Sequence, residues 1–200
     1  MKFVKGLITV YLALDLELNN APDYSTPDPK IIQVGVALGK PWAITTYSWY
    51  VNPQEPIYPN ITQLTGITDH DIQHKSVPLS VVAQELGELI ERYKPFVNPV
   101  TWGRGDMDSL LGEFFSYGCS FPHFGRRYID VKTWYTLHML AKDKRPAGGL
   151  RSAMAEYKLK FEGTPHRADV DAKNTLRLFF EILARQRKTN EIIQLAKEAQ

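Results

Sequence analysis

The clearest pattern in the sequence is a strict alternation of side-chain character between residues 7 and 18. The first face holds only aliphatic residues: Ile8, Val10, Leu12, Leu14, Leu16 and Leu18. The second face is mixed: Thr9, Tyr11, Ala13, Asp15 and Glu17. A period of two predicts a β-strand. This strand is expected to have one apolar face, and a second face that ends in two acids.

Two more strands are expected directly after it. Residues 19–30 contain three prolines and predict a loop. Residues 31–38 and 44–51 are rich in β-branched and aromatic side chains, and Gly39 and Pro41 separate them. Three strands joined by short connections predict an antiparallel meander at the start of the chain.

The remaining residues alternate mostly helical patterns with short strands. Helical spacing predicts short turns over 61–71, helices over 81–93, 106–115, 131–141, 150–157 and 168–185, and a separate short helix over 190–198. Strands are expected over 96–102 and 128–130, and the Pro-rich residues 52–60 are expected to be irregular. The pattern predicts one α/β domain over residues 1–200, built around a mixed sheet.

Composition narrows the class of protein. The chain is 44% hydrophobic and 23% charged, which excludes collagen-like and disordered classes. Its single cysteine, Cys119, excludes an intramolecular disulfide framework, and we expect a cytoplasmic protein. No apolar run approaches the ~18 residues of a membrane helix. Lys2 and Lys5 before an apolar run superficially copy a signal peptide, but no small-x-small cleavage site follows.

Charge is unevenly distributed. Residues 1–119 carry 8 basic and 13 acidic side chains, whereas residues 120–168 carry 10 and 4. An acidic part joined to a basic stretch suits a cation site beside a phosphate-binding surface. Chance solvation of loops explains the same numbers equally well.

Asp15 and Glu17 are the first candidates for chemistry. Two residues apart on a strand, they leave the same face about 6.6 Å apart at ~3.3 Å per residue. Two carboxylates at this spacing can share one metal ion or contribute to a two-metal site. The alternative is that the strand simply ends there and its last residues reach solvent.

Asp106 is the second candidate. It follows a strand-like run and opens a predicted helix, which is where open α/β sheets place their sites. Helix capping is a strong alternative. Asp108 competes for either role, but ~200° of helix rotation lets only one of the two face a common site.

The third candidate is the pair His166 and Asp171. Pro165 indicates that His166 lies in a loop, with Asp171 in the first turns of the following helix. A loop imidazole can accept a proton near neutral pH, and a helical carboxylate is fixed in the way that a metal ligand requires. Asp169 is the more solvent-facing acid in this interpretation. An exposed histidine followed by a first-turn acid is the alternative. The remaining histidines are expected to be structural or on the surface: His70, His74, His123 and His138.

Together these segments resemble the motifs of the DEDDh 3′–5′ exonuclease superfamily, which includes RNase T, oligoribonuclease and polymerase proofreading domains. Residues 12–17 (LALDLE), 102–107 (WGRGDM) and 166–172 (HRADVDA, with its H-x4-D spacing) are similar to the three motifs. Residues 64–67 (LTGI) are similar to a segment beside the terminal base. Gly149-Leu150 and residues 161–164 (FEGT) are similar to the lead into the third motif. The likeness spans roughly residues 7–185 in the right order.

The resemblance implies an RNase H-like fold, a mixed five-stranded sheet flanked by helices and a two-metal mechanism. By it, Asp15, Glu17 and Asp171 bind one divalent ion, and Asp15 bridges to a second ion held by Asp106. His166 is the general base, and the products are nucleoside 5′-monophosphates released from a 3′ end. Mg²⁺ or Mn²⁺ suits the oxygen ligands.

The expected partner is a single-stranded 3′ end of DNA or RNA, with no membrane, and a homodimer is compatible because some relatives dimerise. By the resemblance, the substrate contacts are Leu16, Leu18, Leu64, Thr65 and Ile67. For Leu64 and Ile67, a role in the core is an equal alternative. Basic residues of the 142–151 segment either follow the phosphate backbone or belong to a solvated loop: Lys142, Lys144, Arg145 and Arg151.

Two segments depart from the family pattern. The departures affect positions expected to contact substrate, and they leave every expected metal ligand in place. Leu18-Asn19 replaces small or hydroxyl residues, and Arg104-Gly105 stands where an asparagine or aromatic residue is common. Two rival functions are a silent nucleic-acid-binding or interaction module and an endonuclease of the broader RNase H-like class. The complete acidic set with His166 favours the exonuclease.

Overall fold

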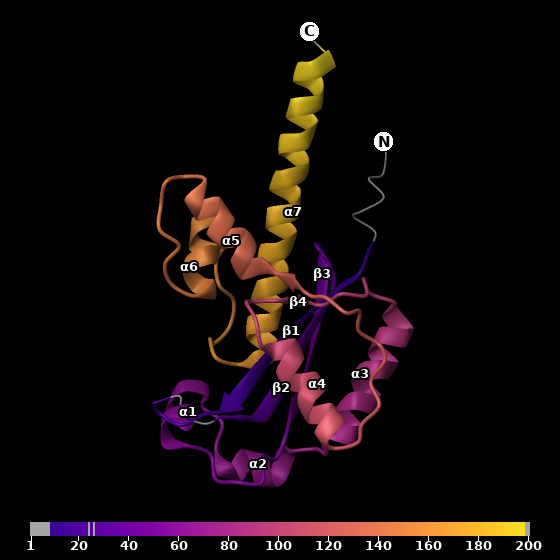
Figure 1. Cartoon of the computed structure of the whole chain (residues 1–200), viewed down its shortest axis with the longest axis vertical. Helices are drawn as coiled ribbons and strands as arrows, with labels where there is room; N and C mark the ends of the chain where they lie inside the picture. Colours follow the sequence, from indigo (N-terminus) through magenta and orange to yellow (C-terminus); the bar gives the residue numbers. More distant parts are fainter. Residues whose placement is uncertain (1–8, 24, 26, 199–200) are drawn as a thin grey trace.

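The computed structural model describes residues 9–23, 25 and 27–198 of the chain. Five strands form one mixed sheet in the order β3-β2-β1-β4-β5 (Figure 1). Strands β1 (Tyr11–Asn19), β2 (Lys30–Lys40) and β3 (Ala43–Tyr50) form the predicted antiparallel meander. Strands β4 (Val100–Thr101) and β5 (Ile129–Asp130) add to β1 in parallel. The predicted α/β class with a mixed five-stranded sheet is confirmed.

One face of the sheet packs on helices α3 (Leu79–Tyr93) and α4 (Asp106–Ser116). The aliphatic face of β1 supplies Leu12, Leu14 and Leu16 to this core, as the alternation predicts. Residues Leu7 and Ile8 of the predicted strand lie outside the described part of the chain. Full burial of Leu12 and Leu14 contributes about 1.5–3 kcal/mol for each side chain.

The opposite face packs on helices α5 (Val131–Leu140), α6 (Leu150–Glu156) and α7 (Ala168–Glu198). Here Ala13 of β1 and Ala37 of β2 are fully buried beneath α7. Small side chains at these sheet positions let the helix approach closely. The face that carries Asp15 and Glu17 is therefore the face that α7 covers.

Helix α7 differs from its prediction. We expected a helix over 168–185 and a separate one over 190–198, but a single helix of 31 residues runs through both and projects beyond the other elements (Figure 1). No glycine or proline lies between residues 185 and 190, so nothing in the backbone interrupts it. The prediction of two helices was wrong because a loss of apolar periodicity marks the loss of a partner, not the end of a helix.

The strand predicted over 96–102 is also shorter than expected, since β4 holds only Val100–Thr101. Pro99 lacks the N–H that a ladder needs. Before it, the Phe96 N–H donates to the carbonyl of Val10, the residue that precedes β1, at 2.8 Å. Among the described helices, none combines the length and apolar character that crossing a membrane requires.

A small third core lies beside the end of β1, under helices α1 (Pro59–Thr65) and α2 (Asp69–Lys75). A register shift after Glu17 pairs Glu17 with Gln33 but Leu18 with Ile31, so Ile32 is an extra residue on β2. Ile32 packs among Ile57, Ile61, Ile67 and Ile72. This bulge redirects the chain next to the acidic end of β1, which is a common place for a bulge near a functional site.

Candidate active site

Three carboxylates meet where α7 begins over the sheet. Asp15 and Glu17 project from β1, and Asp171 projects from the first turn of α7. One carboxylate oxygen of each lies within 4.8 Å of the others. Glu17 is only 8% exposed, although it is an acid. The predicted side-by-side placement of Asp15 and Glu17 is therefore found, and the structure adds Asp171 to them.

Gly35 is the reason that α7 can bring Asp171 so close. It pairs directly with Asp15 across the sheet. A Cβ added at Gly35 would lie 2.1 Å from both the Ala168 carbonyl carbon and the Asp169 nitrogen. The backbone of α7 therefore crosses β2 in contact with it. Only a residue without a side chain permits this approach.

Gln33, one step further along the same face, fixes the first residue of α7. Gln33 is fully buried and pairs with Glu17 across the sheet. Its Oε1 accepts a hydrogen bond from the Ala168 N–H at 3.1 Å, and its Nε2 donates to Ser48 Oγ at 2.7 Å. The first N–H groups of a helix have no partner inside the helix, so this side chain satisfies one of them.

The surroundings of these three carboxyl groups disfavour their negative charge. Burial, and then the charge of Asp171, raise the pKa of Glu17 to about 8, although Arg167 acts in the opposite direction. Burial raises the pKa of Asp15 well above its usual range, with further increases from Asp106, Glu17 and Asp171. Burial also raises the pKa of Asp171, against a hydrogen bond from His166. Without a cation, the protonated form of Glu17 is therefore favoured at neutral pH.

Asp106 lies next to this cluster but is not one of its three members. It is the first residue of α4, and burial raises its pKa to about 7. Its charge also acts on Asp15. Its rival Asp108 is exposed. The loop before Asp106 is held by two bonds: Thr101 Oγ1 donates to the Gly103 carbonyl at 2.8 Å, and Gly103 N–H donates to Asp130 Oδ1 at 3.1 Å.

His166 lies in the loop before α7, where Pro165 indicated that it would lie. It is exposed, and its backbone has φ 61°, a left-handed conformation. Its N–H donates to Asp171 Oδ2 at 2.9 Å. Non-glycine residues in this conformation carry local strain and cluster at functional sites. The histidine is thus tied by its backbone to an acid of the cluster, while its ring stays at the surface.

The donor set fits a divalent cation. Carboxylate oxygens are the ligands that Mg²⁺ and Mn²⁺ prefer. The raised pKa values of Asp15, Glu17, Asp106 and Asp171 show that this position favours added positive charge. Asp15, Glu17 and Asp171 are the residues that can hold such an ion together.

The predicted substrate contacts differ in accessibility. Leu64 is 47% exposed on α1, and Leu18 is half-buried. Leu16 lies in the core under α3 and α4, and Ile67 lies in the small core under α1 and α2. Thr65 is buried, and its hydroxyl donates to the Ile61 carbonyl. Contact of these five residues with a nucleotide stays a prediction.

Asn19 and the basic 142–151 segment, which the sequence also singled out, make polar contacts within the protein. Asn19 is fully buried, and it accepts from the Tyr58 N–H while donating to Glu55 and the Pro56 carbonyl. It therefore ties the end of β1 to the segment before α1. In the basic 142–151 segment, Lys142 pairs with Glu156 at 2.7 Å. The role of this segment toward phosphates stays a prediction.

Sequence reasoning missed Gln33 and Gly35, the two β2 residues that position α7. Both lie in a strand that was predicted, and Gly35 was a visible signal because glycine weakens a strand unless another backbone comes close. Gln33 was also a signal, since it is a polar residue within an apolar run. Their partner in α7 is more than 130 residues away in sequence, so only the register and the fold reveal the contact.

Comparison with known proteins gives a consistent result. The model of the RNase T exonuclease family matches residues 12–179. ERI1 exoribonuclease 2 of Danio rerio is 31% identical over 147 residues, covering 63% of this chain and 26% of that protein. The 3′–5′ exonuclease DinG of Bacillus subtilis (strain 168) is 27% identical over 180 residues, covering 89% of this chain and 18% of that protein. The chain spans about a quarter of the first relative and under a fifth of the second.

Solved structures show the same fold. The nuclease domain of 3′hExo, a DEDDh family member bound to rAMP, superposes with a TM-score of 0.75 at 19% identity. The match covers 88% of this chain and 92% of that domain. The RNase H-like exonuclease fold is therefore confirmed.

Proposed function

This chain belongs to the RNase T exonuclease family, within the DEDDh 3′–5′ exonuclease superfamily, and from that membership we propose that it removes nucleotides from the 3′ end of single-stranded DNA or RNA with the help of two divalent metal ions. The site residues proposed are Asp15, Glu17, Asp106 and Asp171 as metal ligands and His166 as the general base. Residues 1–200 act as one domain in this proposal.

One observation carries the proposal. Asp15, Glu17 and Asp171 converge from a strand and a helix to within 4.8 Å, in an environment that disfavours their charge. A structural role gives no reason to gather three acids in this way, because their burial costs several kcal/mol without a cation. A nucleic-acid-binding module has still less reason, since these acids repel phosphates.

Bound Mg²⁺ or Mn²⁺ supplies an activated water and stabilises the charge that develops on the leaving oxygen. The chain's own residues set the positions for this chemistry. The charges of Asp106, Glu17 and Asp171 all act on Asp15, so Asp15 is the ligand that we propose would be shared by two ions. Gln33 and Gly35 hold the start of α7, and with it Asp171, against β1.

In this proposal, His166 accepts the proton of the attacking water. Its backbone N–H donates to Asp171, and its side chain is exposed. A neutral imidazole is a suitable base near neutral pH. Transfer of that proton gives a hydroxide-like oxygen that bonds to phosphorus. The bond from phosphorus to the 3′ oxygen of the preceding nucleotide breaks, and that oxygen takes a proton from solvent. The products are a nucleoside 5′-monophosphate and a chain shortened by one nucleotide.

Substrate selection is the second part of the proposal. An exposed leucine, Leu64, on α1 offers an apolar surface close to the end of β1, and unpaired bases stack on such surfaces. The 3′hExo nuclease domain holds rAMP, which is a nucleoside monophosphate. This supports a monophosphate as the product, and it leaves the choice between DNA and RNA to experiment.

A gel time course tests the proposal directly. Single-stranded, blunt and 3′-recessed DNA and RNA carry a 5′ label and are incubated with Mg²⁺, Mn²⁺ or EDTA. We expect a ladder that shortens from the 3′ end, fastest on the single strand, and no shortening in EDTA. The His166→Ala variant is expected to lose rate at saturating substrate while keeping its affinity for Mg²⁺.

Two outcomes contradict the proposal. No shortening with either metal favours a silent nucleic-acid-binding module. Cleavage of a circular single strand favours an endonuclease, because a circle has no 3′ end. Unchanged turnover of His166→Ala removes that residue from the role of base.

A further inference from the structure

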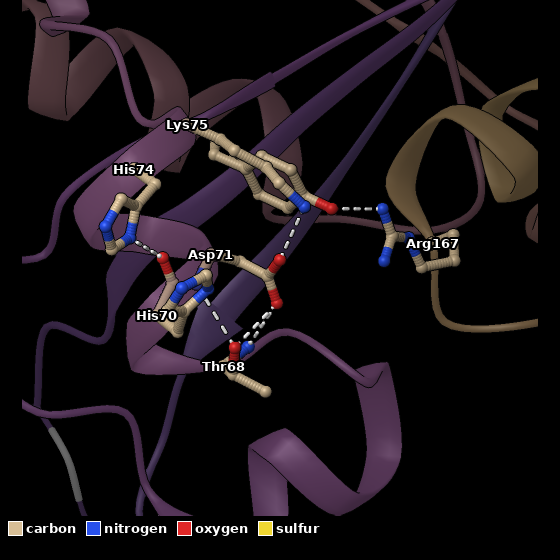
Figure 2. A network of polar contacts seen from close by, with 7 residues as sticks. Thr68, His70, Asp71, His74, Lys75 and Arg167 are labelled. Atoms are coloured by element: carbon tan, nitrogen blue, oxygen red, sulfur yellow. Dashed lines mark hydrogen bonds and ion pairs between the residues drawn. The ribbon is translucent and has the colours of Figure 1, made fainter.

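A group of charged and hydroxyl side chains lies between α2 and the start of α7 (Figure 2). The Arg167 guanidinium donates to the hydroxyl of Tyr50, and its Cζ lies 5.5 Å from the centre of that ring. Lys75 pairs with Asp71 at 2.6 Å. Asp71 raises the pKa of Lys75, against a smaller opposing effect of the Arg167 charge. The two cations therefore lie close enough to repel each other.

The donors in this group outnumber their acceptors. A guanidinium offers N–H donors on all three nitrogens, and a phenol offers one O–H donor. Within the described part of the chain, Arg167 uses only its bond to Tyr50. The same residues provide no acceptor for the Tyr50 hydroxyl proton. Because Tyr50 and Arg167 are only half-buried, these donors can be reached by an anion from solvent.

The register of the sheet places this group next to the metal-binding carboxylates. Glu17, Gln33 and Tyr50 pair in one row across β1, β2 and β3, on the face that α7 covers. Arg167 directly precedes Ala168, which is bonded to Gln33 in the middle of that row. The guanidinium therefore lies against Tyr50, at one end of the row that has Glu17 at its other end. Its positive charge lowers the pKa of Glu17.

We propose that Arg167, oriented by Tyr50 and assisted by Lys75, forms a subsite that binds a phosphate group of the nucleic acid one step away from the bond that is cut. The inference rests on the proposed function, because it assigns this subsite to the same substrate. The phosphate is either an internal phosphodiester or a phosphate at the 3′ end. Both present the oxygens that an arginine fork binds best.

A purely structural role for Arg167 gives different expectations. A clamp between the start of α7 and β3 would weaken every reaction equally, whatever the charge of the substrate. A phosphate contact instead depends on one particular phosphate and on salt, because each phosphate contact contributes to the salt dependence of binding. The substrate can therefore be changed to separate the two roles.

The experiment measures binding of 5′-labelled single-stranded oligonucleotides by fluorescence anisotropy in Ca²⁺, with a gel to verify that they stay intact. Arg167→Gln is expected to weaken the Kd about tenfold, and Arg167→Lys by less, because a lysine keeps the charge but not the fork. The matched control is Arg92→Gln on α3, since Arg92 also lies over a tyrosine, 5.2 Å from the ring of Tyr93. We expect the control to bind like the wild type.

A series of oligonucleotides, each with one neutral methylphosphonate linkage, locates the phosphate. At the contacted linkage, the wild type loses about tenfold and Arg167→Gln loses nothing more. If a 3′-phosphate strengthens wild-type binding and Arg167→Gln abolishes that gain, the phosphate is the terminal one. An equal loss by Arg167→Gln on every oligonucleotide, or no loss at all, overturns the inference. Wild-type protein that binds but hydrolyses nothing in Mg²⁺ or Mn²⁺ contradicts the proposed function alone.

Discussion

The two faces of strand β1 have opposite effects on stability, although their residues alternate along the same nine positions. On one face, Leu12, Leu14 and Leu16 pack into an apolar core with α3 and α4. On the other, Asp15 and Glu17 carry raised pKa values beneath α7. The first face contributes stability through burial of aliphatic side chains. The second gives up stability, because it buries carboxylates that repel one another.

In β1, the residues that stabilise the fold and the residues proposed for chemistry are only one position apart. A strand places neighbouring residues on opposite faces. One rigid strand can therefore be anchored firmly by its leucines while it holds strained acids in fixed positions. Changes on the two faces should then have opposite signatures, on stability in one case and on turnover in the other.

The largest effect is expected from Asp15→Asn on the acidic face. The amide keeps the shape of the side chain but loses the charge that binds metal, so we expect turnover to fall by at least about a thousandfold. The melting temperature in EDTA at pH 8 is expected not to fall, because the variant removes one buried charge from a repelling cluster. Gel kinetics and thermal melting measure the two quantities.

Leu14→Ala, one residue away on the same strand, is the matched control. Leu14 is fully buried, so the variant is expected to lose roughly 2–5 kcal/mol of unfolding free energy. Turnover per folded molecule should stay near the wild-type value at low temperature. The separation of the two faces is disproved if Leu14→Ala loses turnover while folded, or if Asp15→Asn unfolds.

The next largest effect is expected from Gly35→Ala, which breaks the contact between the sheet and α7. The new methyl group would lie 2.1 Å from the backbone of Ala168 and Asp169, so the start of α7 has to move. We expect about a hundredfold loss of turnover, because a shift of ~1 Å in a catalytic group can cost that much. A loss of about 1–3 kcal/mol in unfolding free energy should accompany it.

Gly112→Ala on the exposed side of α4 serves as the control for this variant. Nothing lies within 4 Å of a Cβ added there. Alanine in place of a helical glycine should raise stability by about 0.5–1 kcal/mol and leave turnover unchanged. Full turnover in Gly35→Ala would show that α7 does not need this close approach.

Local periodicity was sufficient to predict the opening strand, its two faces and the four helices between residues 79 and 156. The acids of the candidate site were also named from the sequence, through their places in a strand or at a helix start and the resemblance to the exonuclease motifs: Asp15, Glu17, Asp106 and Asp171. What brings them together was not. The extra residue Ile32 sets the register that places Gln33 beside Glu17, and a sequence pattern does not encode register directly.

The long C-terminal helix shows the opposite limitation. Ile192, Ile193 and Leu195 are about half exposed or more, so the end of α7 has no partner among the described residues that would create a periodic pattern. Helix propensity and the absence of a breaker continue the helix there. Pattern analysis detects packing, and it therefore ends an element where packing ends.

The pH dependence of stability also tests the difference between the two faces of β1. The folded-state pKa of Glu17 is raised to about 8 and that of Asp106 to about 7, whereas unfolded carboxylates titrate near ~4. The folded protein thus binds more protons than the unfolded chain, and stability falls as pH rises. In EDTA, we expect a loss on the order of 4 kcal/mol between pH 6 and pH 8.5, measured by urea unfolding.

Mg²⁺ should largely abolish this pH dependence, because the cation replaces the protons. Glu17→Gln should flatten the curve in EDTA, while Glu85→Gln, an exposed acid of α3, should leave it unchanged. Stability in EDTA that rises over the same pH range would contradict the assignment of raised pKa values to the acidic face.

The smallest effect is expected from Gln33→Met, which changes the acidic face without touching an acid. Methionine has a similar length but cannot accept from the Ala168 N–H or donate to Ser48, so the first residue of α7 loses its anchor. We expect kcat to fall about tenfold with little change in KM, since Asp171 and the His166 loop become less well fixed.

Gln33→Glu keeps the acceptor and should restore most of the kcat at high Mg²⁺, where cations offset the added charge. Ser48→Ala removes only the outer bond and should cost less than Gln33→Met. If all three variants lose the same stability and none loses kcat, Gln33 stabilises the sheet alone and the start of α7 is positioned by Gly35.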